Sequence, residues 1–236
     1  MRTVPPTRKS GEEPTGGAQC CRAPRKIRTP AEIGAGGFPV LNSLVNGEWL
    51  KQSDMALWLH IGGTEPKAGW KILNIAPGPH VDFVGDCRTL PQFKDNSVER
   101  IYASHVYEHL GHTAELDGAL KEALRVLVPG GLFQISAPDL EMIASIIVDP
   151  KSTWRDHYFV GSLIFGLQED AYDFHKVGLT QKLLAAYLRH AGFRNVRGVK
   201  PFGLFDDWSS RLIYGRLVSL NMEARKPAAG EKPDQD

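Results

Sequence analysis

The chain has 236 residues, of which 42% are hydrophobic and 23% are charged, and its net charge is +1. This composition fits one medium globular domain with tails, and the near-zero charge excludes a strong general attraction to nucleic acid or anionic lipid. No apolar run approaches the ~20 residues of a membrane-spanning helix, so no membrane span is expected.

Cysteine usage and the N-terminus bear on location. The three cysteines are Cys20, Cys21 and Cys87, an odd number with two adjacent members, so no disulfide framework is expected. A chain without disulfides suits a reducing compartment. Because the N-terminus also lacks the apolar core of a secretory signal, we expect a cytoplasmic protein.

Two tails flank the expected domain. Residues 1–37 are rich in Pro, Gly, Arg and Lys and bury too little apolar surface to offset ordering entropy, so we expect a disordered basic tail. A solvated tail is favoured over a contact with an anionic partner. Residues 226–236 form a second short tail, which leaves 38–225 as a single domain.

Strands and helices alternate through this domain. The hydrophobic pattern predicts strands over 57–61, 71–75, 81–84, 100–103, 132–136, 195–199 and 216–222. It predicts helices over 113–127, 139–148, 154–165 and 180–191. Asp139 and Thr180 are placed as N-caps, and Gly192 ends the last helix. The alternation predicts an α/β fold with a Rossmann-like, open, mostly parallel sheet that binds ligands at the carboxyl ends of its strands.

The first links between strands are short. Eight residues, Gly62 to Gly69, separate the first two predicted strands. A crossover that contains a helix needs about ten to twelve residues, so we expect the first crossover helices to be shortened or absent. An extended return across the sheet is long enough. For the next link, 76–80, a hairpin stays open as an alternative.

The motifs in this order resemble a known family. A glycine pair follows the first strand, "GD" follows the third, and then come "LPQFKDNSVERIYASHVYEHL" and "EALRVLVPGGLFQISAPDL". This order resembles the class I S-adenosylmethionine-dependent methyltransferases, and among them the type 11 group of short predicted enzymes. The resemblance covers 57–224, is most specific over 90–140, and treats "VPGG" (128–131) as the turn into the fifth strand. It implies a sheet with one antiparallel strand near the C-terminal end.

The resemblance also implies a cofactor site for S-adenosyl-L-methionine. Its residues would be Gly62, Gly63, Asn74, Asp86, Leu90 and Ser104. The glycines would permit close backbone approach, Asn74 would accept from the ribose, and Asp86 and Leu90 would border the adenine. Without the family, each polar residue here is also a common turn former.

The pattern departs from the family at two places. Thr64 and Glu65 stand where a third glycine is usual, and Asn74 stands where an acidic residue is usual. Losing a charge-assisted hydrogen bond weakens binding by about 1 kcal/mol. We expect loop N–H groups or Lys67 to compensate for the missing helix N-terminus.

The segment "ASHVYEHL" ends the fourth strand, and its Ser104 and His105 would face the transferred methyl group. His105 and His109 are candidate general bases because imidazole titrates near neutral pH. The alternative is that Glu108 and His109 only cap and orient the next segment. His105, Glu108 and His109 also resemble a metal cluster, but no further group at ligand spacing supports one, so no metal site is predicted.

Residues 152–179 interrupt the alternation where this fold inserts a substrate cover. The segment concentrates aromatic and titratable side chains, and we expect His157, Tyr158, Tyr172 and His175 to bind substrate. The alternative is an extra packing helix with a polar rim.

The sequence therefore predicts a methyltransferase that uses S-adenosylmethionine and acts on a small-molecule or glycan-precursor acceptor. A catalytically inactive methyltransferase-like scaffold is the alternative, motivated by the absent third glycine and by Asn74. A nicotinamide-dependent oxidoreductase is disfavoured, because that fold needs a third glycine and a helix start beneath the pyrophosphate. No nucleic-acid partner is expected.

Overall fold

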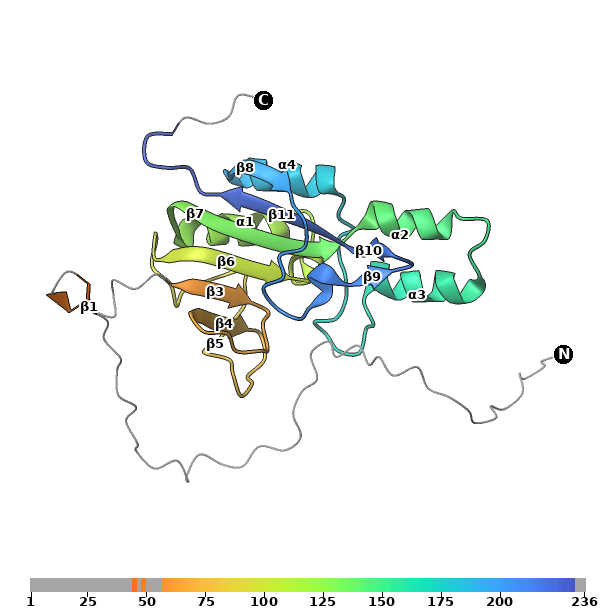
Figure 1. Cartoon of the computed structure of the whole chain (residues 1–236), viewed down its shortest axis with the longest axis horizontal. Coiled ribbons are helices and arrows are strands. Elements are labelled where there is room, and N and C mark those ends of the chain that lie inside the picture. The colour runs from red at the N-terminus through yellow and green to blue at the C-terminus, as the bar shows by residue number, and fades with distance from the viewer. Residues whose placement is uncertain (1–43, 46–47, 50–56, 232–236) are drawn as a thin grey trace, which may run out of the picture. The chain divides into compact units, whose positions relative to one another are not determined.

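The computed structural model describes residues 44–45, 48–49 and 57–231 (Figure 1). β1 (Leu44–Val45) and β2 (Glu48–Trp49) form a two-residue antiparallel pair. The basic tail predicted over 1–37 lies outside the described residues. Within the described residues, no helix is long and apolar enough to cross a membrane.

A seven-stranded sheet forms the centre of the domain. Its strands are β3 (Trp58–Ile61), β4 (Trp70–Asn74), β5 (Phe83–Val84), β6 (Val98–Ser104), β7 (Leu127–Pro138), β8 (Arg194–Gly198) and β11 (Ser219–Arg225). They lie in the order β5-β4-β3-β6-β7-β11-β8. β11 is antiparallel to both neighbours, and the pairs β5-β4-β3-β6-β7 are all parallel. The predicted fold class is confirmed.

Four helices form where the sequence places them. They are α1 (Glu115–Val126), α2 (Leu140–Ile147), α3 (Trp154–Phe165) and α4 (Gln181–Ala191). Asp139 caps α2 by accepting from the N–H groups of Glu141 and Met142. Thr180 caps α4, which ends at the left-handed Gly192. In Figure 1, α2 and α3 extend beyond the carboxyl ends of β6 and β7, while α1 and α4 lie along the sheet.

The main core lies between the sheet and α1 with α4. Leu120 of α1 and Leu188 of α4 are fully buried in one apolar cluster with Phe133 and Ile135 of β7. Each such side chain contributes about 2 kcal/mol by leaving water. This packing fixes β6 and β7 and therefore the loops that follow them.

An aromatic loop covers part of the opposite face of the sheet. The ring of Phe205 stacks within 4.0 Å of the ring of His60 in β3 and within 5.2 Å of that of Tyr102 in β6. The Tyr102 hydroxyl donates to Asp207 at 2.6 Å. The loop between β8 and η3 (Trp208–Ser210) thus occupies a face that crossover helices cover in many α/β sheets.

The links after β3 and after β4 contain no helix, as their short lengths predict. The chain passes from β3 to a parallel β4 without a helix, and β5 is also parallel to β4, so the possible hairpin at 76–80 does not form. Backbone hydrogen bonds between the loops and β4 hold these links in place. Gly62 donates to the Leu73 carbonyl at 2.8 Å, and Gly85 donates to the Asn74 carbonyl at 2.9 Å.

Three predicted boundaries differ from the structure. The turn predicted over 128–131 is part of β7. Its residues form an irregularity in the pairing with β6, where the register shifts between Val98 and Arg100. The strand predicted over 216–222 is divided: β10 (Arg216–Leu217) pairs with β9 (Leu212–Ile213), and β11 begins at Ser219. Lys226, placed in the predicted tail, is anchored by Nζ contacts to Asn96 and Arg125.

Candidate functional site

The site lies where the chain reverses direction across the sheet. The chain runs outward from β3 to β5, then returns to β6 on the other side of β3. Loops that follow the two central strands meet at this switch point, where open α/β sheets bind ligands. Gly62 follows β3 with a φ of 79°, and a Cβ there would lie 2.4 Å from Cγ2 of Val106, in the loop after β6.

Gly63 has no room for a side chain because His60, in the preceding strand, lies against it. A Cβ at Gly63 would lie 2.4 Å from Nδ1 of His60. His60 is buried beneath the loop, and no described residue forms a hydrogen bond with that nitrogen. Burial lowers the pKa of His60 to about 4, although the Asp207 carboxylate acts in the opposite direction. The glycine pair therefore first serves internal packing.

Asn74 connects two loops. Its amide Nδ2 donates to the Gly63 carbonyl at 3.0 Å, and its Oδ1 accepts from the Ala76 N–H at 3.1 Å. The side chain is 7% exposed. Both polar atoms thus have protein partners, as the turn-forming alternative requires.

The two predicted adenine residues have different surroundings. Asp86 is held by Arg88, which donates to its Oδ2 from two nitrogens at 2.9 and 2.6 Å. Burial acts to raise the pKa of the Asp86 carboxyl, but the hydrogen bonds and charge of Arg88 outweigh it and keep that pKa below its ordinary value. Leu90 is fully buried in the main core and presents no surface to a ligand.

Lys67 also has a protein partner. Its Nζ donates to the Leu204 carbonyl at 2.7 Å and lies 5.5 Å from the centre of the Phe205 ring. The residue expected to support the cofactor carboxylate therefore joins the glycine loop to the aromatic loop.

The loop after β6 contains a strained histidine. His105 has a φ of 55°, a conformation that side-chain-bearing residues rarely adopt and that costs about 1–3 kcal/mol. Its Nε2 lies 2.7 Å from Oγ of Ser219, and its Nδ1 lies 3.2 Å from Oε1 of Glu108. The preceding Ser104 has a buried Oγ that lies beside the Tyr102 hydroxyl.

Glu108 is a buried carboxylate at the centre of this loop. It lies in η2 (Tyr107–His109) and is 1% exposed. Burial acts to raise the pKa of Glu108, but His105, with smaller contributions from His109 and His175, lowers that pKa below its ordinary value. The neighbouring histidines therefore favour the ionised form of this buried carboxyl group.

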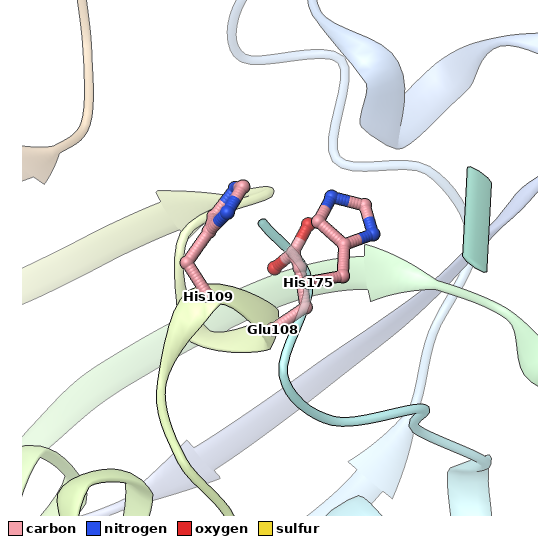
Figure 2. Close-up of side chains that lie close together, drawn as sticks. All are labelled: Glu108, His109 and His175. Atoms are coloured by element: carbon pink, nitrogen blue, oxygen red, sulfur yellow. The ribbon is translucent and has the colours of Figure 1, made fainter. Parts of the chain in front are cut away.

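His109 and His175 lie beside this carboxylate. Their ring centres are 4.7 Å apart, and Figure 2 shows the Glu108 carboxylate between the two rings. Burial lowers the pKa of His175, although Glu108 acts to raise it. The contact depends on backbone pairing, since the N–H groups of Lys176 and Val177 donate to the Glu108 carbonyl.

Glu115 links the surrounding loops through ion pairs and a hydrogen bond. Its carboxylate contacts Arg88 at 2.6 Å and Lys176 at 3.1 Å, and it accepts from the Gly111 N–H at 2.8 Å. The Gly111 N–H, Lys176 and Arg88 lower the pKa of Glu115 to about 2. The loops after β5 and β6 are thereby tied to the segment that carries His175.

Of the four predicted substrate residues, the structure brings only His175 to this cluster. His157 and Tyr158 are exposed on α3, and Tyr172 is 63% exposed in the loop after it. Sequence reasoning did not single out His60 or Ser219, which lie near the switch point. The segment 206–210, which contains Asp207, was expected to border the pocket. His60 and Ser219 are far apart in the chain, so only the fold reveals their proximity.

The residues present fit S-adenosylmethionine in part. The Gly63 N–H has no acceptor among the described residues and remains for a polar ligand, whereas the buried Ser104 Oγ lies beside the Tyr102 hydroxyl. At the end of β4, by contrast, both polar atoms of the Asn74 side chain already have protein partners, and one N–H and one Oδ1 lone pair are left over. The site therefore suits the amino-acid end of the cofactor better than its ribose.

Comparison with known proteins gives the family. Residues 68–135 match the type 11 family model described as a methyltransferase domain. No curated protein sequence matches the chain. The predicted resemblance to the S-adenosylmethionine-dependent methyltransferases is thereby confirmed over the matched residues, and the match indicates S-adenosylmethionine as the cofactor.

Solved structures of methyltransferases are also similar. A SAM-dependent methyltransferase from Archaeoglobus fulgidus is 17% identical over 74% of this chain and 87% of its own, with a TM-score of 0.49. The CurJ carbon methyltransferase is 15% identical over 76% of this chain, with a TM-score of 0.45. The chain spans 50% of the CurJ structure. These likenesses say nothing of this chain's methyl acceptor.

Proposed function

We propose that this chain, which contains a type 11 methyltransferase domain, transfers a methyl group from S-adenosylmethionine to a small-molecule or glycan-precursor acceptor. The observation that supports this most is the position of the matched segment. Residues 68–135 run from just before β4 into β7 and include Ser104, the last residue of β6, and the buried Glu108 that follows it.

The cofactor supplies an electrophilic methyl group on a sulfonium, so the protein mainly aligns the acceptor and excludes water. We assign Gly62 and Gly63 to the cofactor's amino-acid end and Ser104 to the neighbourhood of the methyl group. Asp86 borders the adenine in this proposal. Asn74 contributes indirectly by holding the Gly63 carbonyl.

The two candidate bases receive different roles. Both nitrogens of His105 have protein partners, Glu108 and Ser219, so we assign His105 to positioning. His109 is half-buried, and among the described residues only its Nδ1 has a protein partner, the Phe174 carbonyl. His109 is therefore the histidine with a nitrogen left for the acceptor or for an ion that holds it.

The substrate cover and the location complete the proposal. In this proposal, residues 152–179 cover the acceptor, and the domain spans 38–225. We also place the protein in the cytoplasm. The cover is supported by the approach of His175 to Glu108 and by the exposed Trp154 and Tyr158 of α3. The cytoplasmic location is supported by the free, buried Cys87.

A second candidate function is an inactive methyltransferase-like scaffold. It is favoured by the glycine side of the site, where the side chains of Asn74 and Lys67 are already bound within the protein. An inert domain needs no ligand to complete such contacts.

Calorimetric titration with S-adenosylhomocysteine separates the two functions. We expect one binding site, with NAD as a control ligand that does not bind. No S-adenosylhomocysteine binding at millimolar concentration would remove the enzyme and leave the scaffold.

A further inference from the structure

We propose that Glu108, His109 and His175 form a binding site for a divalent transition-metal ion of the zinc type. Each residue offers one ligand atom, and these atoms lie within 4.8 Å of one another. The ligands of a tetrahedral zinc ion are roughly 3.4 Å apart, a spacing that small side-chain rotations reach from here. The site is separate from the cofactor residues on the glycine side.

The first support is the unpartnered oxygen of Glu108. Oε1 approaches His105 Nδ1 to 3.2 Å, but Oε2 is buried and no described residue donates a hydrogen bond to it. Buried charges in proteins are paired or coordinate metals, because an isolated buried carboxylate is costly. Figure 2 shows this carboxylate between the two imidazole rings, where a cation would complete its coordination.

The second support is the orientation of the two histidines. His109 Nδ1 lies 3.2 Å from the Phe174 carbonyl, and His175 Nδ1 lies 3.0 Å from the Leu163 carbonyl. A carbonyl oxygen only accepts, so the hydrogen of each neutral ring is on Nδ1 and the lone pair is on Nε2. Metal-binding histidines are usually held in this way, by a carbonyl or carboxylate on the other nitrogen.

The third support is the set of groups that holds the carboxylate. Ser219 contacts His105 Nε2 at 2.7 Å, and His105 in turn contacts Glu108. This chain of contacts places Oε1 beside His105 Nδ1, while Oε2 has no donor among the described residues. Groups that orient a ligating carboxylate commonly take part in metal sites.

The donor set selects the ion. Two imidazole nitrogens and one carboxylate oxygen suit zinc and its neighbours, whereas Mg²⁺ and Ca²⁺ prefer oxygen ligands. Three protein ligands leave a coordination position open, as in catalytic zinc sites. His109 and His175 are only half-buried, so this position is within reach of solvent.

The open position gives the ion a role that rests on the proposed function. An oxygen or nitrogen atom of the methyl acceptor would occupy it and be held beside the loop after β6. Acceptors with a hydroxyl or amine able to bind zinc would then be preferred. The ion's binding itself does not depend on this role.

The test is calorimetric titration of the untagged, chelator-treated full chain with Zn²⁺ alone, with metal content confirmed by mass spectrometry. We expect one Zn²⁺ per chain and no binding of Mg²⁺. His175→Ala, His109→Ala and Glu108→Gln should each weaken Zn²⁺ binding by roughly 100-fold or more. His80→Ala, at an exposed histidine far along the chain, should leave it unchanged.

Two further measurements keep the outcomes distinct. His175→Gln retains side-chain bulk, and its melting temperature and S-adenosylhomocysteine binding should match those of the wild type, so a loss of Zn²⁺ binding there is not a folding failure. Failure of the wild type to bind Zn²⁺ at millimolar concentration would overturn the metal site. Equal Zn²⁺ affinity in the wild type and the His175 variants would also overturn it. Failure to bind S-adenosylhomocysteine would instead overturn the proposed function.

Discussion

The two sides of the switch point differ in how their polar groups are used. On the glycine side, after β3 and β4, the side chains of Asn74 and Lys67 are bound within the protein. On the β6 side, Glu108 Oε2 is buried and accepts no hydrogen bond from a described residue, and beneath the glycine loop Nδ1 of His60 is likewise without a described partner. Buried polar groups are normally satisfied, so each exception calls for an explanation, and a functional role is one.

This difference assigns different tasks to the two sides. The glycine side has lost the third glycine and its crossover helix, and its remaining residues mainly stabilise the fold. The β6 side accepts the strain of His105 and an unsatisfied buried carboxylate, features that persist where function requires them. Substitutions on the glycine side should therefore change stability first, and those on the β6 side should change turnover first.

The largest effect expected on the glycine side concerns His60 and pH. The pKa of His60 in the folded chain is about 4, below its ordinary 6.5, so the unfolded chain takes up the proton first as the pH falls. The stability contributed by neutral His60 is complete above pH 6.5 and is lost down to about pH 4, a total of about 3 kcal/mol. Urea unfolding of the wild type and His60→Gln across this range measures it. Identical pH dependence in the two proteins would contradict the effect.

Gly63→Ala should destabilise the fold by about 2 kcal/mol. The added Cβ would meet the His60 ring at 2.4 Å, and overpacking in a closed site is costly. Gly118→Ala in α1 is the matched control, because its Cβ meets nothing within 4 Å. That control should gain about 1 kcal/mol of stability from helix propensity. Equal denaturation midpoints for the two variants would show that the glycine loop is not closely packed.

Asn74→Asp should cost about 1.5 kcal/mol of stability, because a carboxylate cannot donate to the Gly63 carbonyl. Asn96→Asp is the control, since only the oxygen of that amide is used, by Lys226. The same variants should be titrated with S-adenosylhomocysteine. Tighter binding by Asn74→Asp would restore the ribose role to this position.

Lys67→Ala should have the smallest effect, below about 0.5 kcal/mol in stability. Its Nζ contacts a carbonyl of the aromatic loop at the protein surface, so S-adenosylhomocysteine affinity should stay within twofold. A tenfold loss of affinity would mean that Lys67 does support the cofactor, as the sequence suggested.

The sequence was informative wherever local chemistry decides the structure. The Thr180 cap and Gly192 stop of α4 follow from capping rules, and the helix-free link after β3 follows from its length. The divided strand at Val218 was not predictable, because Val218 is buried by long-range packing with α2 and α3. Gly63 could be read as a loop glycine, but its requirement for space against His60 appears only in the fold.

The candidate site was also predictable only where its residues lie close together in the sequence. His105, Glu108 and His109 were found because they share a short motif at one strand end. His175 was expected to face substrate, but nothing in the spacing places it beside Glu108, since the contact depends on backbone hydrogen bonds from Lys176 and Val177. We predicted no metal site because the sequence showed no further ligand at suitable spacing from His105, Glu108 and His109. The position of His175 beside Glu108 leads us to revise that prediction.

Mass spectrometry of cell extract incubated with labelled S-adenosylmethionine tests the central claim most directly. The wild type should transfer label to an acceptor. Glu108→Gln and His175→Gln should bind S-adenosylhomocysteine normally yet yield about one hundredth of the labelled product, a loss typical of a disturbed metal site. Absence of any wild-type product, or equal labelling by the wild type and both variants, would contradict the assignment of catalysis to the loop after β6.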